Sequence, residues 1–270
     1  MIKLNLGVNK DVSNEEYHAD REYISSSGIK KLYWDELAYE KEYILGEKED
    51  KAPSNALQEG TAIHTKILEP HLYDQQIVVY QEFDKRGNAY KAFELQNPGK
   101  LVISLSQQMR LDGMFKAYQD RPEAVELINS SEKEFTICKE INGIKCKVRA
   151  DAINIDKGMI IDIKSTGYSA ELETFKANAY SKLLSYDISA ALYSMVAEAE
   201  YGKPFDFYYV VISKSEYKCE IYKASEVAQI NGRNKIFKAL EKLAYYRANG
   251  KWPENGKKAP EKGAYIIRDL

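Results

Sequence analysis

Hydrophobic and polar residues alternate in two neighbouring stretches of the chain, residues 144–155 and 159–166. Both stretches are rich in β-branched residues, and a period of two is typical of strands with one buried face. Asp156, Lys157 and Gly158 lie between them, a composition that is typical of a tight turn. The pattern therefore predicts an antiparallel β-hairpin.

The turn also predicts which polar side chains face one another. If Asp156 and Lys157 are the two central turn residues, counting along the strands places Asp151 opposite Asp162. Lys164 lies two residues beyond Asp162 and shares its face. A three-residue loop, with the glycine of the turn in the left-handed region, would instead shift the pairing by one residue and separate the carboxylates.

Two carboxylates held this close repel each other unless a cation lies between them. Hard oxygen ligands on a short rigid scaffold suit Mg²⁺ or Mn²⁺. Lys164 would then orient or deprotonate a water molecule beside the metal. The alternative is a hairpin whose charged face is only solvated, with Lys164 paired to Asp162.

Periodicity predicts the other elements. Helical periods predict helices over residues 25–42, 55–69, 105–118, 122–129, 181–201 and 225–249. Alternating or continuous apolar runs predict further strands over residues 76–80, 132–140, 205–213 and 217–223. Asn142-Gly143 joins the strand at 132–140 to the hairpin, which gives a three-strand meander. Residues 81–100 carry no pattern that assigns them.

The helix predicted over residues 55–69 places a histidine on its apolar stripe. This stripe contains Ala56, Gly60, Ile63, His64 and Ile67. The simpler interpretation is a core histidine that is hydrogen-bonded to a neighbour. If the stripe packs on the hairpin, His64 becomes a third metal ligand. Glu134 is either a further carboxylate near the metal or an exposed strand residue.

Composition narrows the class of protein. The chain has 270 residues, 44% of them hydrophobic, and a formal net charge of −2, so it carries no global signal for nucleic-acid binding. Three cysteines are too few for a disulfide framework and one short of an iron–sulfur cluster. No stretch reaches the length of a membrane span, and a cytoplasmic location is expected.

We expect one domain over residues 1–270. It would have an N-terminal helical region over about 1–54 and a C-terminal helix plus tail over about 224–270. The charged run at residues 47–51, followed by Pro53, is typical of an exposed linker.

Several short motifs follow one another between residues 17 and 193. They are Tyr17-His18-Ala19-Asp20, Ile24-Ser25-Ser26-Ser27-Gly28, Gly60-Thr61-Ala62-Ile63-His64, Leu68-Glu69-Pro70, Val148-Arg149-Ala150-Asp151, Ile161-Asp162-Ile163-Lys164-Ser165-Thr166, Tyr186-Asp187 and Ala190-Ala191-Leu192-Tyr193. In this order they resemble the RecE-like family, phage-type exodeoxyribonuclease VIII, of the PD-(D/E)XK nuclease superfamily. The resemblance implies an α/β fold with a restriction-endonuclease-like core: helix, three-strand meander, helix and strand, with helical additions.

The resemblance also implies the chemistry. His64, Asp151, Asp162 and the carbonyl of Ile163 would hold Mg²⁺ or Mn²⁺, and Lys164 would be the catalytic lysine. The activity implied is 5′-to-3′ digestion of linear double-stranded DNA in phage-type recombination. The remaining 3′ strand would pass to a single-strand annealing protein. By analogy, the nuclease would form a homo-oligomeric ring around DNA.

Seven residues are expected to contact DNA: Arg149, Lys147, Ser165, Thr166, Tyr186, Ser189 and Tyr193. The basic residues share the face of Asp151 by strand parity, and the alternative for the lysine is a solvated strand edge. Each tyrosine would stack on a base or fill a helix interface. Ser189 departs from the family, which usually has glutamine four residues before the tyrosine that Tyr193 matches.

Three rival functions stay open. An endonuclease of the same fold would cut closed circular DNA. A DNA-end-binding protein without catalysis would release no nucleotides with Mg²⁺ or Mn²⁺, and the Ser189 departure lends it support. A metal-binding scaffold for a protein partner would show no salt-dependent affinity for DNA.

Overall fold

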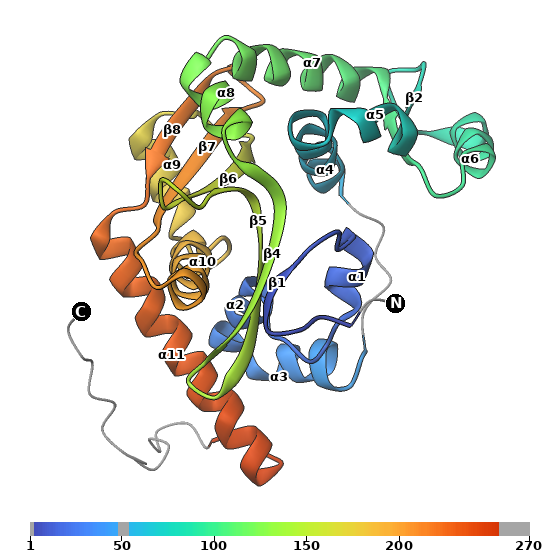
Figure 1. Cartoon of the computed structure of the whole chain (residues 1–270). Coiled ribbons are helices and arrows are strands. Elements are labelled where there is room, and N and C mark those ends of the chain that lie inside the picture. The colour runs from blue at the N-terminus through green and yellow to red at the C-terminus, as the bar shows by residue number, and fades with distance from the viewer. Residues whose placement is uncertain (1–2, 48–53, 254–270) are drawn as a thin grey trace.

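A six-stranded sheet lies at the centre of the molecule, in a computed structural model that describes residues 3–47 and 54–253 (Figure 1). Its strands follow the order β1-β4-β5-β6-β7-β8. Their bounds are β1 Gly7–Asn9, β4 Glu132–Ile141, β5 Ile144–Asn154, β6 Met159–Thr166, β7 Asp206–Ser213 and β8 Cys219–Lys223. Helices cover both faces, which confirms the predicted α/β fold.

The three-strand meander β4-β5-β6 is antiparallel, as predicted. Asn142 and Gly143 both have positive φ, 49° and 74°, as a two-residue hairpin turn requires. In the next hairpin, Ala152 pairs with Ile161, so the register is the one counted from the turn. Gly158 does adopt the left-handed conformation, with φ 61°, but the pairing is not shifted.

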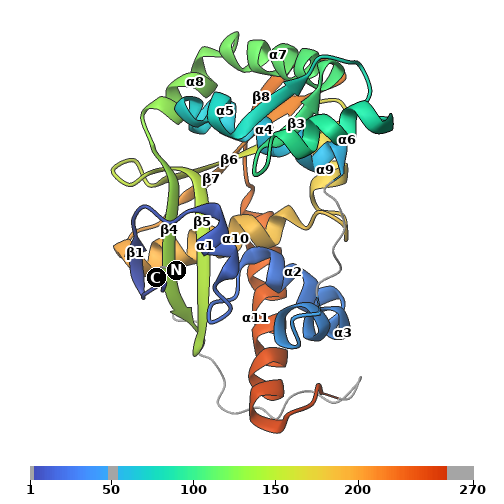
Figure 2. The same cartoon turned by 90° about the vertical axis from the view of Figure 1, so that its right-hand side faces the viewer.

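The sheet separates two hydrophobic cores because its side chains alternate between the faces. Ile160 belongs to the core beneath three helices, which are α2 Ser26–Trp34, α10 Tyr186–Tyr201 and α11 Glu226–Asn249. Ile161 and Ile163 face the opposite core, which is covered by α4 Asn55–Leu68, α7 Leu105–Gln119 and α8 Pro122–Asn129. Figure 2 shows these two groups of helices at opposite ends of the view.

Strand β7 is parallel to β6, and the connection between them crosses one face of the sheet. The crossover contains α9, Leu172–Ala179, and α10. The helix predicted over residues 181–201 begins only at Tyr186, because Ser185 takes the left-handed conformation with φ 41°. This turn places the N-terminus of α10 beside the end of β6.

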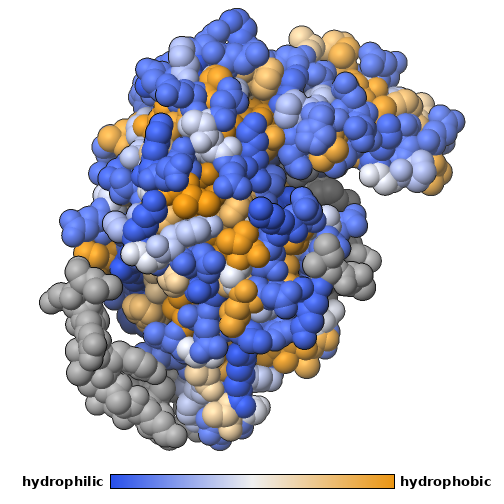
Figure 3. Space-filling model, in the orientation of Figure 1, coloured by the Kyte–Doolittle hydropathy of each residue, from blue (hydrophilic) through white to orange (hydrophobic). Residues whose placement is uncertain are grey.

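Residues 70–104 form an arm that projects from the body of the molecule (Figure 1). It contains α5 Pro70–Gln76, β2 Ile77–Tyr80, α6 Gly87–Gln96 and β3 Leu101–Ser104, with β2 and β3 paired in parallel. Tyr80 packs against Tyr90 and Phe93 of α6. The face seen in Figure 3 is mostly hydrophilic, and its hydrophobic residues lie in several separate areas.

The helix predicted over residues 25–42 is wrong as a single element. The chain extends at Asp35, whose φ is −156°, and the Asp35 carboxylate caps the next helix at the Ala38 N–H. Two short segments follow, α3 Glu36–Tyr39 and the π-helical η1 Glu40–Ile44. A side chain that caps a helix favours a new N-terminus over continuation of the old helix.

The N-terminal segment, residues 3–25, lies along both edges of the β4–β5 pair: β1 pairs antiparallel with β4, and Ile24 forms a parallel bridge to Cys146 of β5. It contains β1 and the short helix α1, Asn14–Ala19, and neither was predicted. The Ile24 N–H donates to the Lys145 carbonyl, and the Lys147 N–H donates to the Ile24 carbonyl. The segment therefore covers part of the face that the hairpin would otherwise leave open.

None of the helices within residues 3–47 and 54–253 combines the length and the apolar character that a membrane crossing requires. The core of the predicted linker, residues 48–53, and the tail beyond residue 253 lie outside the described residues.

Candidate active site

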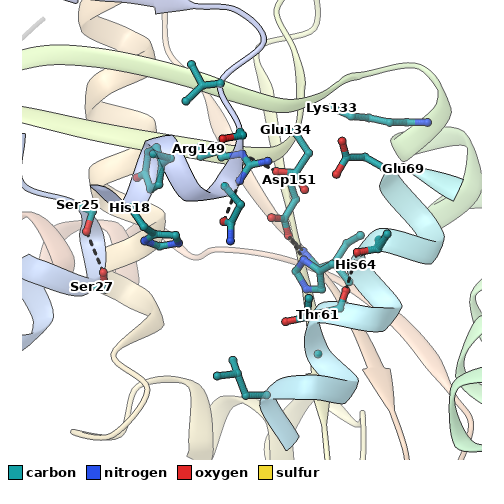
Figure 4. Close-up of a pocket in the computed structure, with 18 of the residues that line it drawn as sticks. His18, Ser25, Ser27, Thr61, His64, Glu69, Lys133, Glu134, Arg149 and Asp151 are labelled. Carbon is teal, nitrogen blue, oxygen red and sulfur yellow. Dashed lines mark hydrogen bonds and ion pairs between the residues drawn. The ribbon is translucent and has the colours of Figure 1, made fainter. Parts of the chain in front are cut away.

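A cavity of about 900 Å³ lies between α4 and the N-terminal segment, at the ends of β5 and β6. Its lining includes His64, Asp151, Lys164 and Tyr186. Figure 4 shows His64 of α4 pointing towards Asp151 of β5, with Glu134 and Glu69 nearby. The cavity thus brings together residues from helices and strands that are far apart in the sequence.

Asp151 connects the hairpin to α4. The regular β5–β6 pairing ends at Ala152, and the Ile163 N–H donates instead to Asp151 Oδ2, at 2.7 Å. The same oxygen lies 3.5 Å from His64 Nδ1. Of the predicted stripe, Ile63 and Ile67 pack in the core with the hairpin residues Ile161 and Ile163. Ala56 is exposed, and His64 lies at the rim of this contact, 29% exposed, beside Asp151.

Asp162 is almost fully buried, at 5% exposure, and its Oδ2 lies 2.5 Å from Lys164 Nζ. Burial raises the pKa of Asp162, and the nearby Asp151 raises it further, whereas Lys164 opposes both effects. Burial alone would lower the pKa of Lys164, but the Asp162 and Asp151 carboxylates outweigh burial and raise it. Both carboxylates therefore favour the charged form of Lys164.

The donor groups suit a hard divalent cation in their chemistry. The Asp151 carboxylate, the His64 imidazole and residue Ile163 line the cavity, whereas the Asp162 carboxylate is buried and does not line it. Across residues 3–47 and 54–253, no three His, Cys, Asp or Glu side chains gather closely enough to form a complete ligand set. The raised pKa of Asp162 beside Asp151 is nevertheless the electrostatic condition that a bound cation would relieve.

Residues 25–262 match the family described as "PDDEXK-like domain of unknown function (DUF3799)". The chain belongs to the DUF3799 family. The match confirms the PD-(D/E)XK superfamily, and the narrower RecE-like family stays a prediction.

One solved structure supports the fold. A "Putative exonuclease" from Eubacterium rectale is 19% identical, with a TM-score of 0.65 over 91% of this chain and 89% of that one. A second structure, a protein named SSO0001, is 17% identical over 66% of this chain and 86% of that one. Its TM-score of 0.30 is too low to support a shared fold. No curated protein matches the chain. The family and the first structure together support a nuclease.

A strained residue of the DUF3799 domain lies opposite Asp151. Glu134 has a φ of 51° within β4, an uncommon conformation for a residue with a side chain. Its carboxylate lines the cavity and lies 2.8 Å from Arg149 Nε, while Arg149 also donates to Asn14 Oδ1 at 3.0 Å. Glu134 is therefore a half-buried residue of the site rather than an exposed strand carboxylate.

The structure does not leave Lys147 free for the DNA contact predicted for it. Strand parity is right, but the N-terminal segment covers this position and the side chain is 4% exposed. The Lys147 ammonium donates to the carbonyls of Tyr17 and Asp20, the latter at 2.7 Å. The N-terminal segment carries no pattern that would predict this burial.

Ser189 of α10 does not line the cavity of the DUF3799 domain and is buried, at 6% exposure. Tyr193 reaches the cavity and hydrogen-bonds to Ser26, while its ring packs edge-on against Phe207. The position of Tyr193 is therefore compatible with both roles considered for it, packing in a helix interface and stacking on a base of DNA.

The other predicted contact residues lie at the cavity or beside it. Ser165 and Tyr186 line the cavity, and Arg149 does so while paired with Glu134. Thr166 directly follows Ser165, and its hydroxyl accepts the Tyr168 N–H at 3.1 Å. No signal in the sequence pointed to Lys30 of α2, whose ammonium lies 5.2 Å from the centre of the Tyr186 ring.

Proposed function

We propose that this DUF3799 domain hydrolyses phosphodiester bonds of DNA with the help of a divalent metal ion, Mg²⁺ or Mn²⁺. One arrangement carries the proposal. His64 of α4 pairs with Asp151 of β5, and Lys164 pairs with Asp162 on the neighbouring strand β6. The Asp151 carboxylate is close enough to raise the pKa of Asp162. Nucleases of the PD-(D/E)XK class generally use divalent metal ions, which agrees with this donor set.

Each residue has a role in this proposal. His64, Asp151, Asp162 and the Ile163 carbonyl would hold the ion, which when bound polarises the scissile phosphate and lowers the pKa of a water molecule. The two carboxylates favour the charged form of Lys164, which would orient the attacking water and offset the charge that develops on the phosphate. The ion pair with Asp162 and the nearby Tyr186 ring hold the Lys164 ammonium in place.

The finer activity follows from the RecE-like resemblance. We propose an exonuclease that digests linear double-stranded DNA from 5′ to 3′ in phage-type recombination, with a single-strand annealing protein as partner and a homo-oligomeric ring as its assembly. The fold shared with the "Putative exonuclease" supports the proposal that this chain is an exonuclease.

The decisive experiment is to incubate the purified protein with linear and closed circular duplexes and Mg²⁺. The linear duplexes carry a label at the 5′ or the 3′ end. An exonuclease releases nucleotides from linear DNA only, with the order of release giving the polarity. Cutting of circles would identify an endonuclease, and binding without release would identify a DNA-end-binding protein.

Lys164→Ala should abolish Mg²⁺-dependent degradation, with a loss of at least about 100-fold, because it removes the cation that stabilises the transition state. Thermal unfolding of the variant is measured in parallel, since Asp162 loses its partner. Wild-type digestion by a folded Lys164→Ala variant would contradict the proposed chemistry.

A further inference from the structure

A cluster of lysines and aromatic rings continues from the cavity along α2 and the N-terminus of α10. The Tyr186 ring has Lys164 on one side, with Nζ 5.0 Å from the ring centre, and is also approached by Lys30, at 5.2 Å. Lys30 and Trp34 are four residues apart on α2 and so lie on the same face of this helix. The proposed catalytic lysine is thus connected to Trp34 through Tyr186 and Lys30.

Trp34 is held in place and remains accessible. Its indole N–H donates to Ser185 Oγ at 2.9 Å, next to the first residue of α10, and the residue is 38% exposed. Two more lysines lie over its ring: Lys182 with Nζ at 5.4 Å and Lys235 at 5.8 Å from the ring centre. A fixed, exposed indole between cations is the arrangement by which proteins stack bases and hold phosphates.

The charges of this cluster are not balanced. Four lysines, at positions 30, 164, 182 and 235, face two aspartates, since Asp162 pairs with Lys164 and Asp187 pairs with Lys235. Within the described chain, Lys30 has no ion pair or hydrogen bond, only its contact with Tyr186. The whole chain has a formal charge of −2, so this positive excess is local.

The cost of burying Lys30 supports a polyanionic ligand. Burial and the nearby Lys164 lower the pKa of Lys30 to about 7, although Asp162 and Asp187 oppose them. A phosphate beside Lys30 would favour the charged form of this lysine and raise its pKa again, so that Lys30 acts as a cation when the ligand is bound. The N-terminus of α10, which no side chain caps, adds a further positive end at the same place.

We propose that Lys30, Trp34, Lys182 and Lys235 form a track that binds the phosphate backbone of a DNA strand as it leaves or enters the proposed catalytic residues. The inference rests on the proposed function, because it identifies the path of the same substrate. Trp34 stacks on an unpaired base in this track, and the lysines contact consecutive phosphates.

Binding is tested with Lys30→Met, Lys182→Gln and the double variant, on a fluorescein-labelled duplex with one single-stranded end. Ca²⁺ replaces Mg²⁺ to separate binding from cleavage, and anisotropy gives Kd at several salt concentrations. Each variant should reduce the slope of log Kd against log salt by about 1, and the double variant by about 2. Kd at physiological salt should rise roughly tenfold for each lysine removed.

Lys31→Met is the matched control, because Lys31 is the next residue of the same helix and pairs with Glu42 instead. It should keep the wild-type salt slope. If the folded double variant keeps the wild-type slope of log Kd against log salt, and the wild type cleaves DNA, the track is wrong but the proposed function is not. If the double variant loses the salt-dependent binding, the track is supported. If the wild type also fails to cleave DNA with Mg²⁺, the proposed function is overturned while the track remains.

Discussion

At the scale of single residues, the site balances buried charges that would otherwise repel. Asp151 and Asp162 lie on neighbouring strands, and Lys164 compensates Asp162 at 2.5 Å while Asp151 has a backbone N–H and His64 as partners. Glu134 adds a third carboxylate opposite Asp151, and Arg149 compensates it. Each carboxylate therefore has its own positive or donor group.

Glu134 predicts a pH dependence of stability. Burial raises the pKa of its carboxyl to about 7, helped by Asp151 and Glu69 and opposed by Arg149. A carboxyl with a raised pKa in the folded state binds its proton more tightly there than in the unfolded chain, so its contribution falls as pH rises from about 5 to 8. That fall is at most about 2.5 kcal/mol.

Glu134→Gln should remove this dependence. The free energy of unfolding of the variant minus that of the wild type should therefore be larger at pH 8 than at pH 5. Urea unfolding in EDTA gives both values. A difference between the two proteins that is the same at both pH values would show that Glu134 ionises normally in the fold.

At the scale of elements, α10 and α11 pack so closely that only glycine fits between them. A Cβ on Gly232 of α11 would lie 2.1 Å from the Asp187 carbonyl oxygen and 2.6 Å from the Ala191 Cβ. The first of these atoms belongs to the backbone and cannot rotate away. This contact holds α11 against the helix whose N-terminus carries Tyr186.

Gly232→Ala should destabilise the fold by about 1–3 kcal/mol, even though alanine favours helix more than glycine by about 1 kcal/mol. Chemical unfolding gives the value. Asn231→Ala, at the preceding exposed position of the same helix, is the control and should be neutral or slightly stabilising. A stabilised Gly232→Ala would mean that the two helices separate without cost.

At the scale of the whole molecule, the cavity is closed by parts of the chain that are more than 100 residues apart. Tyr17, His18 and Ser25 of the N-terminal segment line the same cavity as Asp151 and Lys164. Lys147 anchors this segment, since its ammonium donates to two of the segment's carbonyls. The N-terminal segment is therefore part of the site rather than an appendage.

Lys147→Met should release the segment, because the Tyr17 and Asp20 carbonyls lose their shared donor. Trypsin should then cleave after the exposed Arg21 several-fold faster, as measured by the time course of the N-terminal fragment. Lys145→Met removes a more exposed ion pair with Glu22 and should leave the rate near that of wild type. Equal rates in the two variants would show that Lys147 does not hold the segment.

Local features were predictable from the sequence. The meander and its two turns follow from turn composition and a period of two, which act between residues close in the chain. Their register is the one that predicts Asp151 opposite Asp162, although the regular pairing ends one residue earlier, at Ala152 and Ile161. Elements without such a signal were missed. Strand β1, α6 and α9 are short, and their stability depends on what they pack against.

The sequence by itself therefore determined the hairpin register, and it offered His64 of α4 as a candidate to meet the hairpin. Only the tertiary structure decided which face of the sheet stays open: the N-terminal segment buries Lys147, and α2 brings Lys30 to Tyr186. Periodicity predicts which face of a helix or strand a side chain lies on. Whether that face is buried depends on which distant segment of the chain packs against it. For this reason the same strand holds an anchoring lysine at one position and a candidate metal ligand four residues later.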